Sequence, residues 1–213
     1  MNIRKTNSPK DADEIVGAVS RDGRSVKLVP VESEAAVEFL YQLAIDESVG
    51  WRWRFGGMVP RRDTFEQTLW NGVLTQFVIV EKAHGAMVGS TLAYNADLNH
   101  GTAYVAAAML REATRSGVGI EAADLFAAHL FACYRIRKLY FEVPEYNIPQ
   151  FESSIGWLLR EEGSLLQHTY YQGRFWDRKI LALYREDYES VAAGGRVLGR
   201  RRRVPGHKST RSV

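Results

Sequence analysis

The spacing of hydrophobic and polar positions changes several times along the chain, and each change predicts a different element. Residues 25–31 largely alternate between apolar and polar side chains, which is typical of a strand. Behind Ser33, a residue type that caps helices, apolar residues recur at helical intervals. A second short helix is predicted over residues 64–70, while residues 49–62 between the two helices show no regular spacing.

Three closely spaced apolar segments follow, at residues 76–81, 87–93 and 102–110, and polar turns containing Gly or Asn separate them. This arrangement predicts an antiparallel meander. A pair of glycines then leads into a helix whose predicted apolar stripe is Ile120, Ala123, Ala127, Leu130, Phe131 and Tyr134.

The last part of the pattern predicts a strand over residues 138–143 and a helix over residues 147–155, with Pro149 in its first turn. A hairpin formed by residues 165–171 and 179–184 closes the pattern around Gly173. A meander that leads into one crossover helix predicts an α/β (α+β) fold with a mixed sheet.

Both ends of the chain differ from the segment between them. Residues 1–23 are charged and turn-rich and predict a flexible arm, and residues 1–12 lack the apolar stretch of a signal peptide. Residues 194–213 contain almost no large apolar side chains, so burial cannot offset the entropy of ordering them, and we expect a disordered basic tail. One domain is therefore expected over residues 24–193.

Composition narrows the class of protein. Hydrophobic residues make up 46% of the chain, enough for a sizeable core, yet no apolar run approaches the roughly 20 residues of a membrane helix. A single cysteine, Cys133, excludes an intramolecular disulfide and a metal site built from several thiolates. Its place beside Tyr134 on the packing side of the predicted helix favours a buried, inert thiol. We expect a cytoplasmic protein that holds no metal.

The positive charge is concentrated in the tail. Residues 194–213 carry seven Lys or Arg and no acid, so removing them from the net charge of +3 leaves −4 for residues 1–193. The domain itself is therefore not expected to present a basic face to nucleic acid. The tail, with Arg200–Arg203 at its centre, either contacts nucleic acid, the ribosome or an acidic partner, or is a solvated extension.

Gly117 and Gly119 lie between a predicted strand and a predicted helix. The first amides of a helix have no internal partner and point outward, and glycine lets a phosphate approach that backbone closely. The alternative is a tight turn. The chain contains no Gly-Lys-Ser/Thr of a Walker loop, and the strands that precede the glycines have the wrong order for a dinucleotide-binding fold.

Over residues 24–188 the chain resembles the GCN5-related N-acetyltransferase (GNAT) superfamily. The cofactor signature of that family, Gln/Arg-x-x-Gly-x-Gly/Ala, is similar to residues 114–119, which read Thr-Arg-Ser-Gly-Val-Gly. Residues 139–143 followed by Asn147, then Ile155-Gly156-Trp157 and residues 161–163, resemble its later motifs. The nearest branch is that of the ribosomal-protein N-terminal acetyltransferases. The sequence departs from the family at Thr114 and at Glu152, which stands where a tyrosine often serves as general acid.

The resemblance implies a mostly antiparallel, twisted sheet flanked by helices, with acetyl-CoA as cosubstrate and direct attack of a primary amine on the thioester. Backbone amides near Ala108 would hold the pantetheine arm and polarise the carbonyl. Asn147 is expected either to contact the cofactor or to cap a helix. The implied cofactor-binding residues are Met109, Leu110, Thr114, Arg115, Ser116, Gly117, Val118, Gly119 and Asn147.

Several residues are candidates for the general base and for the partner of the leaving thiolate. A general base is expected at Glu142 or Glu145, with the turn residues Asp97 and His100 as further candidates, and a solvated carboxylate is the alternative for each acid. Partners for the leaving thiolate are sought among the residues that follow the fifth strand. They are Tyr146, Ser153 and Ser154.

Three aromatic residues, Trp51, Trp53 and Phe55, fall where the family places its acceptor loop, and they either line an acceptor pocket or fill the core. The acceptor would be a small-molecule or peptide amine, and a homodimer is compatible with the resemblance. Two other functions remain: an acyl-CoA-binding sensor without turnover, and a protein that associates with the ribosome or nucleic acid through its tail.

Overall fold

A computed structural model describes residues 21–114 and 117–193, so most of the predicted arm and the whole basic tail lie outside the described residues. The helices, short 3-10 turns (η) and strands between them follow one another in the order β1 Val26–Pro30, α1 Glu34–Ile45, η2 Gly50–Arg52, α2 Arg62–Thr68, β2 Val73–Glu81, β3 Met87–Asp97, β4 Thr102–Met109, η3 Arg111–Ala113, α3 Val118–Cys133, β5 Lys138–Pro144, η4 Glu145–Gln150, β6 Leu159–Tyr171, β7 Arg174–Tyr184 and α4 Arg185–Ala193.

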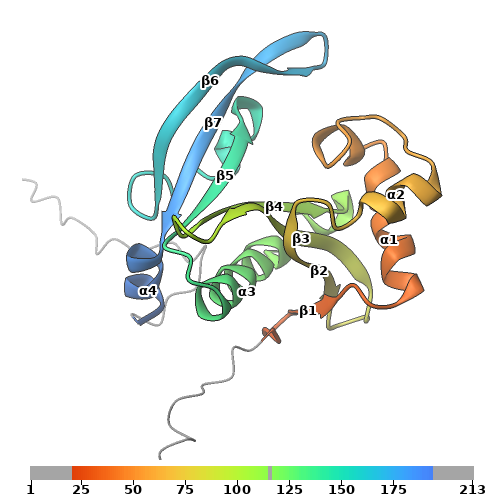
Figure 1. The fold of residues 1–213 in the computed structure, drawn as a ribbon, viewed down its shortest axis with the longest axis horizontal. Helices are drawn as coiled ribbons and strands as arrows, with labels where there is room; N and C mark the ends of the chain where they lie inside the picture. The colour runs from red at the N-terminus through yellow and green to blue at the C-terminus, as the bar shows by residue number, and fades with distance from the viewer. Residues whose placement is uncertain (1–20, 115–116, 194–213) are drawn as a thin grey trace, which may run out of the picture.

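The strands form one seven-stranded sheet in the order β1-β2-β3-β4-β5-β7-β6 (Figure 1). Neighbouring strands are antiparallel except β4 and β5, which run parallel. The crossover between these two strands is α3, because parallel neighbours need a long connection. The predicted mixed, mostly antiparallel sheet is therefore confirmed.

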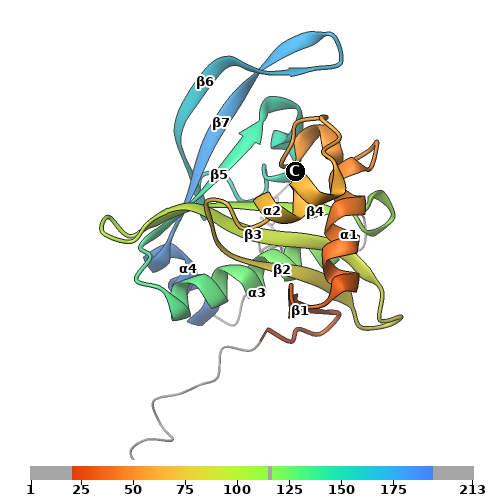
Figure 2. The same ribbon diagram turned by 45° about the vertical axis from the view of Figure 1, so that its right-hand side comes forward.

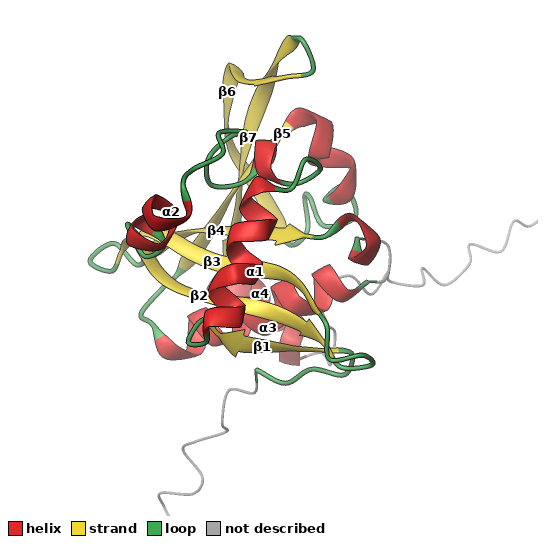
Figure 3. Cartoon of the chain, turned by 90° about the vertical axis from the view of Figure 1, so that its right-hand side faces the viewer, coloured by secondary structure: helices red, strands yellow, loops and turns green. Residues whose placement is uncertain are grey.

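Helices cover both faces of the sheet and give each face its own core. Figure 3 shows α1 in front of β2–β4, with α3 and α4 behind them. Phe126 and Leu130 of α3 pack against the rear face together with Tyr188 of α4. On the front face, Leu40 of α1 and Phe65 of α2 are fully buried.

Local signals placed the first elements correctly. The side chain of Ser33 accepts a hydrogen bond from the Ala36 amide at 3.1 Å, so it caps α1 as predicted. The strands are longer than the pattern indicated: β3 continues to Asp97, and β6 begins at Leu159 rather than at Leu165. A register shift between Glu161 and Gly163 lets β6 continue through a segment that reads as a turn. None of the described helices is long and apolar enough to cross a membrane.

The helix predicted over residues 147–155 is wrong. Residues Glu145–Gln150 form the 3-10 turn η4, and irregular turns follow it. Pro149 lies inside η4, where it cannot donate a hydrogen bond and its ring would clash with the preceding turn of an α-helix. The pattern also missed α4, which follows β7 directly and carries a single buried residue, Tyr188.

Two expectations for α3 are also wrong. The predicted stripe is buried at Ala127, Leu130 and Phe131, but Ile120 is 48% exposed, because the first part of the stripe runs through Val118, Ala122 and Phe126. Cys133 is exposed rather than buried, and its Sγ lies 3.5 Å from Nδ1 of His129, one helical turn earlier. It is the last residue of the helix, where the stripe no longer faces the sheet.

Strands β4 and β5 separate soon after they meet. Their pairing runs only from Thr102 with Lys138 to Tyr104 with Tyr140, although β4 continues to Met109 and β5 to Pro144. In Figures 1 and 2, β5–β7 rise away from β2–β4 beyond this point. Met109 therefore lies at the end of a strand that has lost its neighbour on one side.

An ion pair with a buried lysine connects β5 with the outer strand of the hairpin. Lys138, whose side chain is 9% exposed, lies 2.8 Å from a carboxylate oxygen of Glu162, whose side chain is 26% exposed. Burial disfavours the charged form of both groups, but their hydrogen bonds have the larger effect on each pKa. Hydrogen bonds from Lys138, Tyr184 and Tyr140 lower the pKa of Glu162. The hydrogen bond to Glu162 raises the pKa of Lys138.

We predict that Glu162→Gln destabilises the protein by about 1–3 kcal/mol at pH 7, because it leaves a buried ammonium without its counter-charge. A lowered pKa means that the contribution of Glu162 is present above its unfolded pKa, about 4.3, and is lost as the pH falls through the folded value. Urea unfolding should therefore give a difference from wild type that shrinks toward pH 3.

Glu161→Gln is the matched control, since Glu161 pairs with Lys179 nearer the surface, where the two side chains are 44% and 29% exposed. An equal effect of the two substitutions, or a difference for Glu162→Gln that is the same at all pH values, would contradict the importance of the buried pair.

Candidate functional site

The glycine loop opens α3 beside the end of β4. Gly117 occupies the N-cap of α3 with φ 78°, a left-handed conformation that favours glycine. A Cβ atom at Gly119 would lie 3.6 Å from Cγ of Met109, so helix and strand approach each other closely here. Two residues of the predicted phosphate loop, Arg115 and Ser116, lie outside the described residues.

Backbone amides at the start of α3 are available to an anion. The first hydrogen bond of the helix runs from the Glu121 amide to the Gly117 carbonyl at 3.2 Å, so the amides of residues 118–120 have no partner within the helix. Glu121 is the acid of this first turn, but its carboxylate accepts the Ser25 amide of the neighbouring segment at 2.9 Å. The Thr114 hydroxyl donates to the Arg111 carbonyl.

The two predicted pantetheine-binding amides differ in direction. The Leu110 amide donates to the Val88 carbonyl at 2.9 Å and so belongs to the β3–β4 ladder. Because alternate residues of a strand direct their amides to opposite sides, the Met109 amide faces the opening toward β5. Of these two backbone amides, only that of Met109 is therefore directed to where a ligand could accept its hydrogen bond.

Glu142 lies on β5 just past the last residue pair with β4, on the front face of the sheet. One carboxylate oxygen, Oε2, accepts a hydrogen bond from the Tyr94 hydroxyl of β3 at 3.5 Å. The same atom lies 3.5 Å from Nη1 of Arg178 on β7. Burial, followed by the charge of Glu142, raises the pKa of Tyr94 to about 12, so this hydroxyl keeps its proton at neutral pH.

Four half-buried aromatic residues form a cluster further along β7. Trp51 from η2 stacks on Tyr171 of β6 with ring centroids 3.5 Å apart and an angle of 7°. Tyr146 of η4 packs against both rings and against Trp176 of β7. This aromatic cluster joins the loop after α1 to the β6–β7 hairpin. Trp53 and Phe55, in contrast, belong to the core beneath α1 and α2.

Tyr146, the predicted partner of the thiolate, therefore lies in the aromatic cluster. The other candidates of this segment are spread around it. Glu145 is exposed at the start of η4, and the Asn147 side chain accepts from Gln150 at 3.5 Å within that turn rather than at a helix cap. The amide of Ser154 donates to the Phe151 carbonyl at 2.8 Å.

The turn candidates Asp97 and His100 hold each other through a 2.7 Å contact in the exposed β3–β4 turn. This turn joins the start of β4, whereas the glycine loop follows its end. The structure therefore separates these two residues from Glu142 and from α3. Within the described part of the chain, no group of three His, Cys, Asp or Glu side chains is placed to hold a metal ion.

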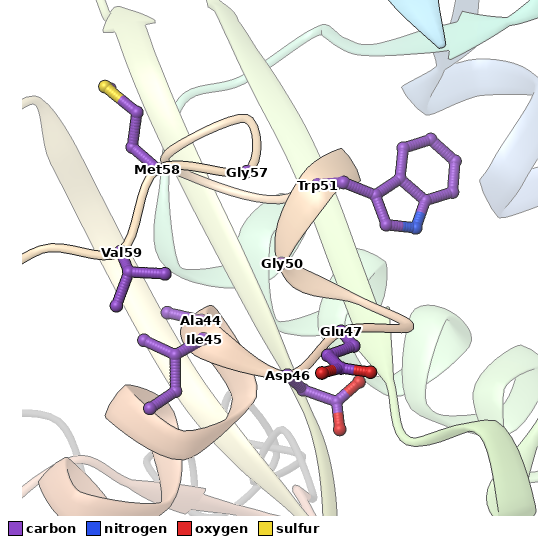
Figure 4. Close-up of a pocket in the computed structure, with 9 residues that line it drawn as sticks. All are labelled: Ala44, Ile45, Asp46, Glu47, Gly50, Trp51, Gly57, Met58 and Val59. Carbon is purple, nitrogen blue, oxygen red and sulfur yellow. The ribbon is translucent and has the colours of Figure 1, made fainter. Parts of the chain in front are cut away.

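A pocket of about 250 Å³ adjoins the aromatic cluster (Figure 4). The end of α1 supplies Asp46 and Glu47, and the loop after η2 supplies Met58 and Val59. Trp51 borders the pocket, and Figure 4 shows its indole pointing away from the methionine. The Asp46 carboxylate accepts the amides of Ser48 and Val49, which holds the wall of the pocket in a turn.

Sequence reasoning did not single out the partners of Glu142 or the aromatic residues of the hairpin. Tyr94 and Arg178 lie 48 and 36 residues from Glu142 in the sequence, so no local pattern marks their contacts with it. It also did not foresee that Arg54 is tied into the core, donating to the Leu69 carbonyl at 3.1 Å and to Gln76. Burial lowers the pKa of Arg54 to about 10.

Comparison with known proteins rests on the fold, since no family model and no curated protein matches the sequence. A solved structure of spermidine N-acetyltransferase from Vibrio cholerae, in complex with CoA and spermine, superposes with a TM-score of 0.66 and 17% identity over 78% of this chain and 98% of that chain. A GCN5-related N-acetyltransferase from Brucella melitensis gives a TM-score of 0.63 and 21% identity over 81% of each chain.

The nearer resemblance to the ribosomal-protein branch stays a prediction. The order of the strands, the single parallel pair and the crossover helix α3 agree with the superpositions over most of the chain. The chain has the fold of the GCN5-related N-acetyltransferases.

Proposed function

We propose that this protein transfers an acetyl group from acetyl-CoA to a primary amine. The observation that carries the proposal is the opening between β4 and β5. At one end it has the amides of residues 118–120, which have no partner within α3, and on its front side it has the Glu142 carboxylate. Amides at the start of a helix bind phosphate groups, and a carboxylate can accept the proton of an ammonium group. The relative from Vibrio cholerae with this fold was solved with CoA and spermine, a cofactor and an amine.

The cofactor would lie with its pyrophosphate at residues 117–120 and its thioester near the Met109 amide. Gly117 and Gly119 leave the backbone accessible, and the Met109 amide is the donor that would polarise the carbonyl. Residues 115 and 116 would complete the loop, as the sequence motif predicts. Leu110 drops out as an amide donor, because the sheet already uses it.

The acceptor would approach from the front face, between Glu142 and the aromatic cluster. Tyrosine and tryptophan rings attract ammonium groups as well as apolar chains. Glu142 is the general base we favour over Glu145, because it lies at the opening and is only 28% exposed, whereas Glu145 is exposed on the outside of η4.

The acceptor ammonium gives one proton to Glu142, and the freed nitrogen lone pair forms a bond to the thioester carbonyl carbon. The carbon–sulfur bond then breaks, the nitrogen loses its second proton, and the thiolate takes a proton to become the free thiol of CoA. Tyr146 and Ser154 remain candidates for that last transfer, and Glu152, which replaces the family tyrosine, is exposed.

A sensor that binds acyl-CoA without turnover is the second candidate. The observation that favours it is the turn structure of residues 147–155, where the sequence pattern predicted a helix. Release of the thiol from acetyl-CoA in the presence of a panel of amines and peptides separates the two candidates. An enzyme releases thiol in proportion to acceptor, and a sensor only binds.

We predict that acetyl-CoA raises the melting temperature of the wild-type protein and of Gly119→Ala, but not of Gly119→Leu. An alanine Cβ fits at 3.6 Å from Met109, whereas a longer side chain runs into that residue and separates helix from strand. Thermal shift with millimolar ligand measures this, because a ligand that binds only the folded state stabilises it. Equal shifts in all three proteins would mean that the loop is not the cofactor site.

We predict that Glu142→Gln lowers kcat/KM for the acceptor by about 100-fold or more, the usual effect of removing a general base. The melting shift with acetyl-CoA should persist in this variant. Glu145→Gln is the comparison, because it removes the neighbouring carboxylate that lies in solvent. A larger loss in Glu145→Gln than in Glu142→Gln would reverse the assignment.

We predict that Trp51→Ala raises the KM for the acceptor by about fivefold, since one aromatic contact contributes about 1 kcal/mol. Loss of the stack on Tyr171 should also speed amide hydrogen exchange at the tip of the β6–β7 hairpin. Trp70→Ala is the control, because Trp70 is 49% exposed and lies outside the cluster. Unchanged exchange in Trp51→Ala would show that the stack does not hold the hairpin.

A further inference from the structure

The Glu142 carboxylate is held through one of its two oxygens. Tyr94 approaches Oε2 from β3, and Arg178 approaches the same atom from β7, both at 3.5 Å. Among the described residues, no hydrogen bond or ion pair reaches Oε1. Two strands that are not direct neighbours thus meet at a single atom of a third strand.

Each of the two donors has its own support. Nε of Arg178 donates to the Thr169 hydroxyl of β6 at 3.1 Å, which fixes the guanidinium plane. The Tyr94 ring packs against Tyr104 with centroids 5.7 Å apart, and Tyr104 packs in turn against Tyr140 at 5.2 Å. Support of this kind sets the direction of a functional side chain more than it adds stability.

Stability alone gives a weak reason for the arrangement. The side chains of Arg178 and Glu142 are 27% and 28% exposed, and an ion pair at 3.5 Å in such a setting contributes little to folding. Two donors on one oxygen nevertheless restrict rotation about the last torsion of the glutamate, which is broad when unrestrained. The carboxylate therefore presents Oε1 in a defined direction.

We infer that Tyr94 and Arg178 are positioning residues that hold Oε2 of Glu142 so that Oε1 accepts the proton of the acceptor ammonium. This inference rests on the proposed acetyl transfer. In the step concerned, an N–H bond of the ammonium breaks, an O–H bond forms at Oε1, and the electron pair stays on nitrogen for attack. Long contacts of 3.5 Å are compatible with the role, because catalytic hydrogen bonds often shorten only when substrate binds.

The high pKa of Tyr94, about 12, keeps it a hydrogen-bond donor throughout the neutral range. Charged or titratable groups that face Glu142 come from three strands: Tyr94 of β3, Tyr104 of β4 and Arg178 of β7. Burial, followed by the charge of Glu142, raises the pKa of Tyr104, but no hydrogen bond joins these two side chains among the described residues. Tyr104 is therefore the natural control.

The kinetic test compares Tyr94→Phe and Arg178→Met with the control Tyr104→Phe. Tyr94→Phe and Arg178→Met should each lower kcat for amine acetylation by about three- to tenfold, because each removes one hydrogen bond to a charged group. The KM for acetyl-CoA should stay the same. Arg178→Lys should restore part of kcat. Tyr104→Phe should leave kcat within about twofold.

A second measurement keeps the inference testable without turnover. In a crystal structure of the double variant Tyr94→Phe/Arg178→Met, we expect the Glu142 carboxylate to leave its present orientation or to occupy several. A carboxylate that stays in place in the double variant, or a kcat that does not fall in either single variant, overturns the inference. Absence of acetyl transfer by the wild-type protein would instead overturn the proposed function.

Discussion

The early end of the pairing between β4 and β5 is the constraint on which the rest of the site depends. Parallel strands joined by a helix normally stay paired, but here only the first residues of each strand meet, up to Tyr104 and Tyr140. Beyond that point the backbone groups on one edge of β4 make no hydrogen bonds to β5. Unpaired backbone groups are costly when buried, so a ligand that pairs with them is favoured. The start of α3 lies at the same place, through the contact of Gly119 with Met109.

The same divergence explains why the second half of the sheet carries chemistry. Strands β5–β7 turn away from the helices of the front face, so side chains that would otherwise be buried become half-exposed. Glu142, with Tyr94 and Arg178 around it, and the ion pair of Lys138 with Glu162 lie on this face. The aromatic cluster connects the far end of the hairpin back to α1 through the stack of Trp51 on Tyr171. The front face thus contains both the Glu142 carboxylate and the aromatic cluster.

Much of the fold was predictable because its signals are local. Ser33 caps a helix through a residue three positions away, and the apolar run in β2 follows from burial of both faces of that strand. The glycine loop was predictable for the same reason. Contacts between strands distant in the sequence were not: nothing near Tyr94 or Arg178 in the chain points to Glu142, and the stack of Trp51 on Tyr171 joins residues of different elements. A single residue, Pro149, turned a predicted helix into η4.

The central claim is that the opening between β4 and β5 receives acyl-CoA with its phosphates on α3. Titration of the ¹⁵N-labelled protein with CoA, followed by amide chemical shifts, tests this claim most directly. The account predicts that the largest shift changes fall on Gly117, Val118, Gly119 and Met109, while Leu110, whose amide the sheet already holds, moves less. Changes confined to other parts of the protein, with the amides of α3 and β4 unmoved, would contradict it.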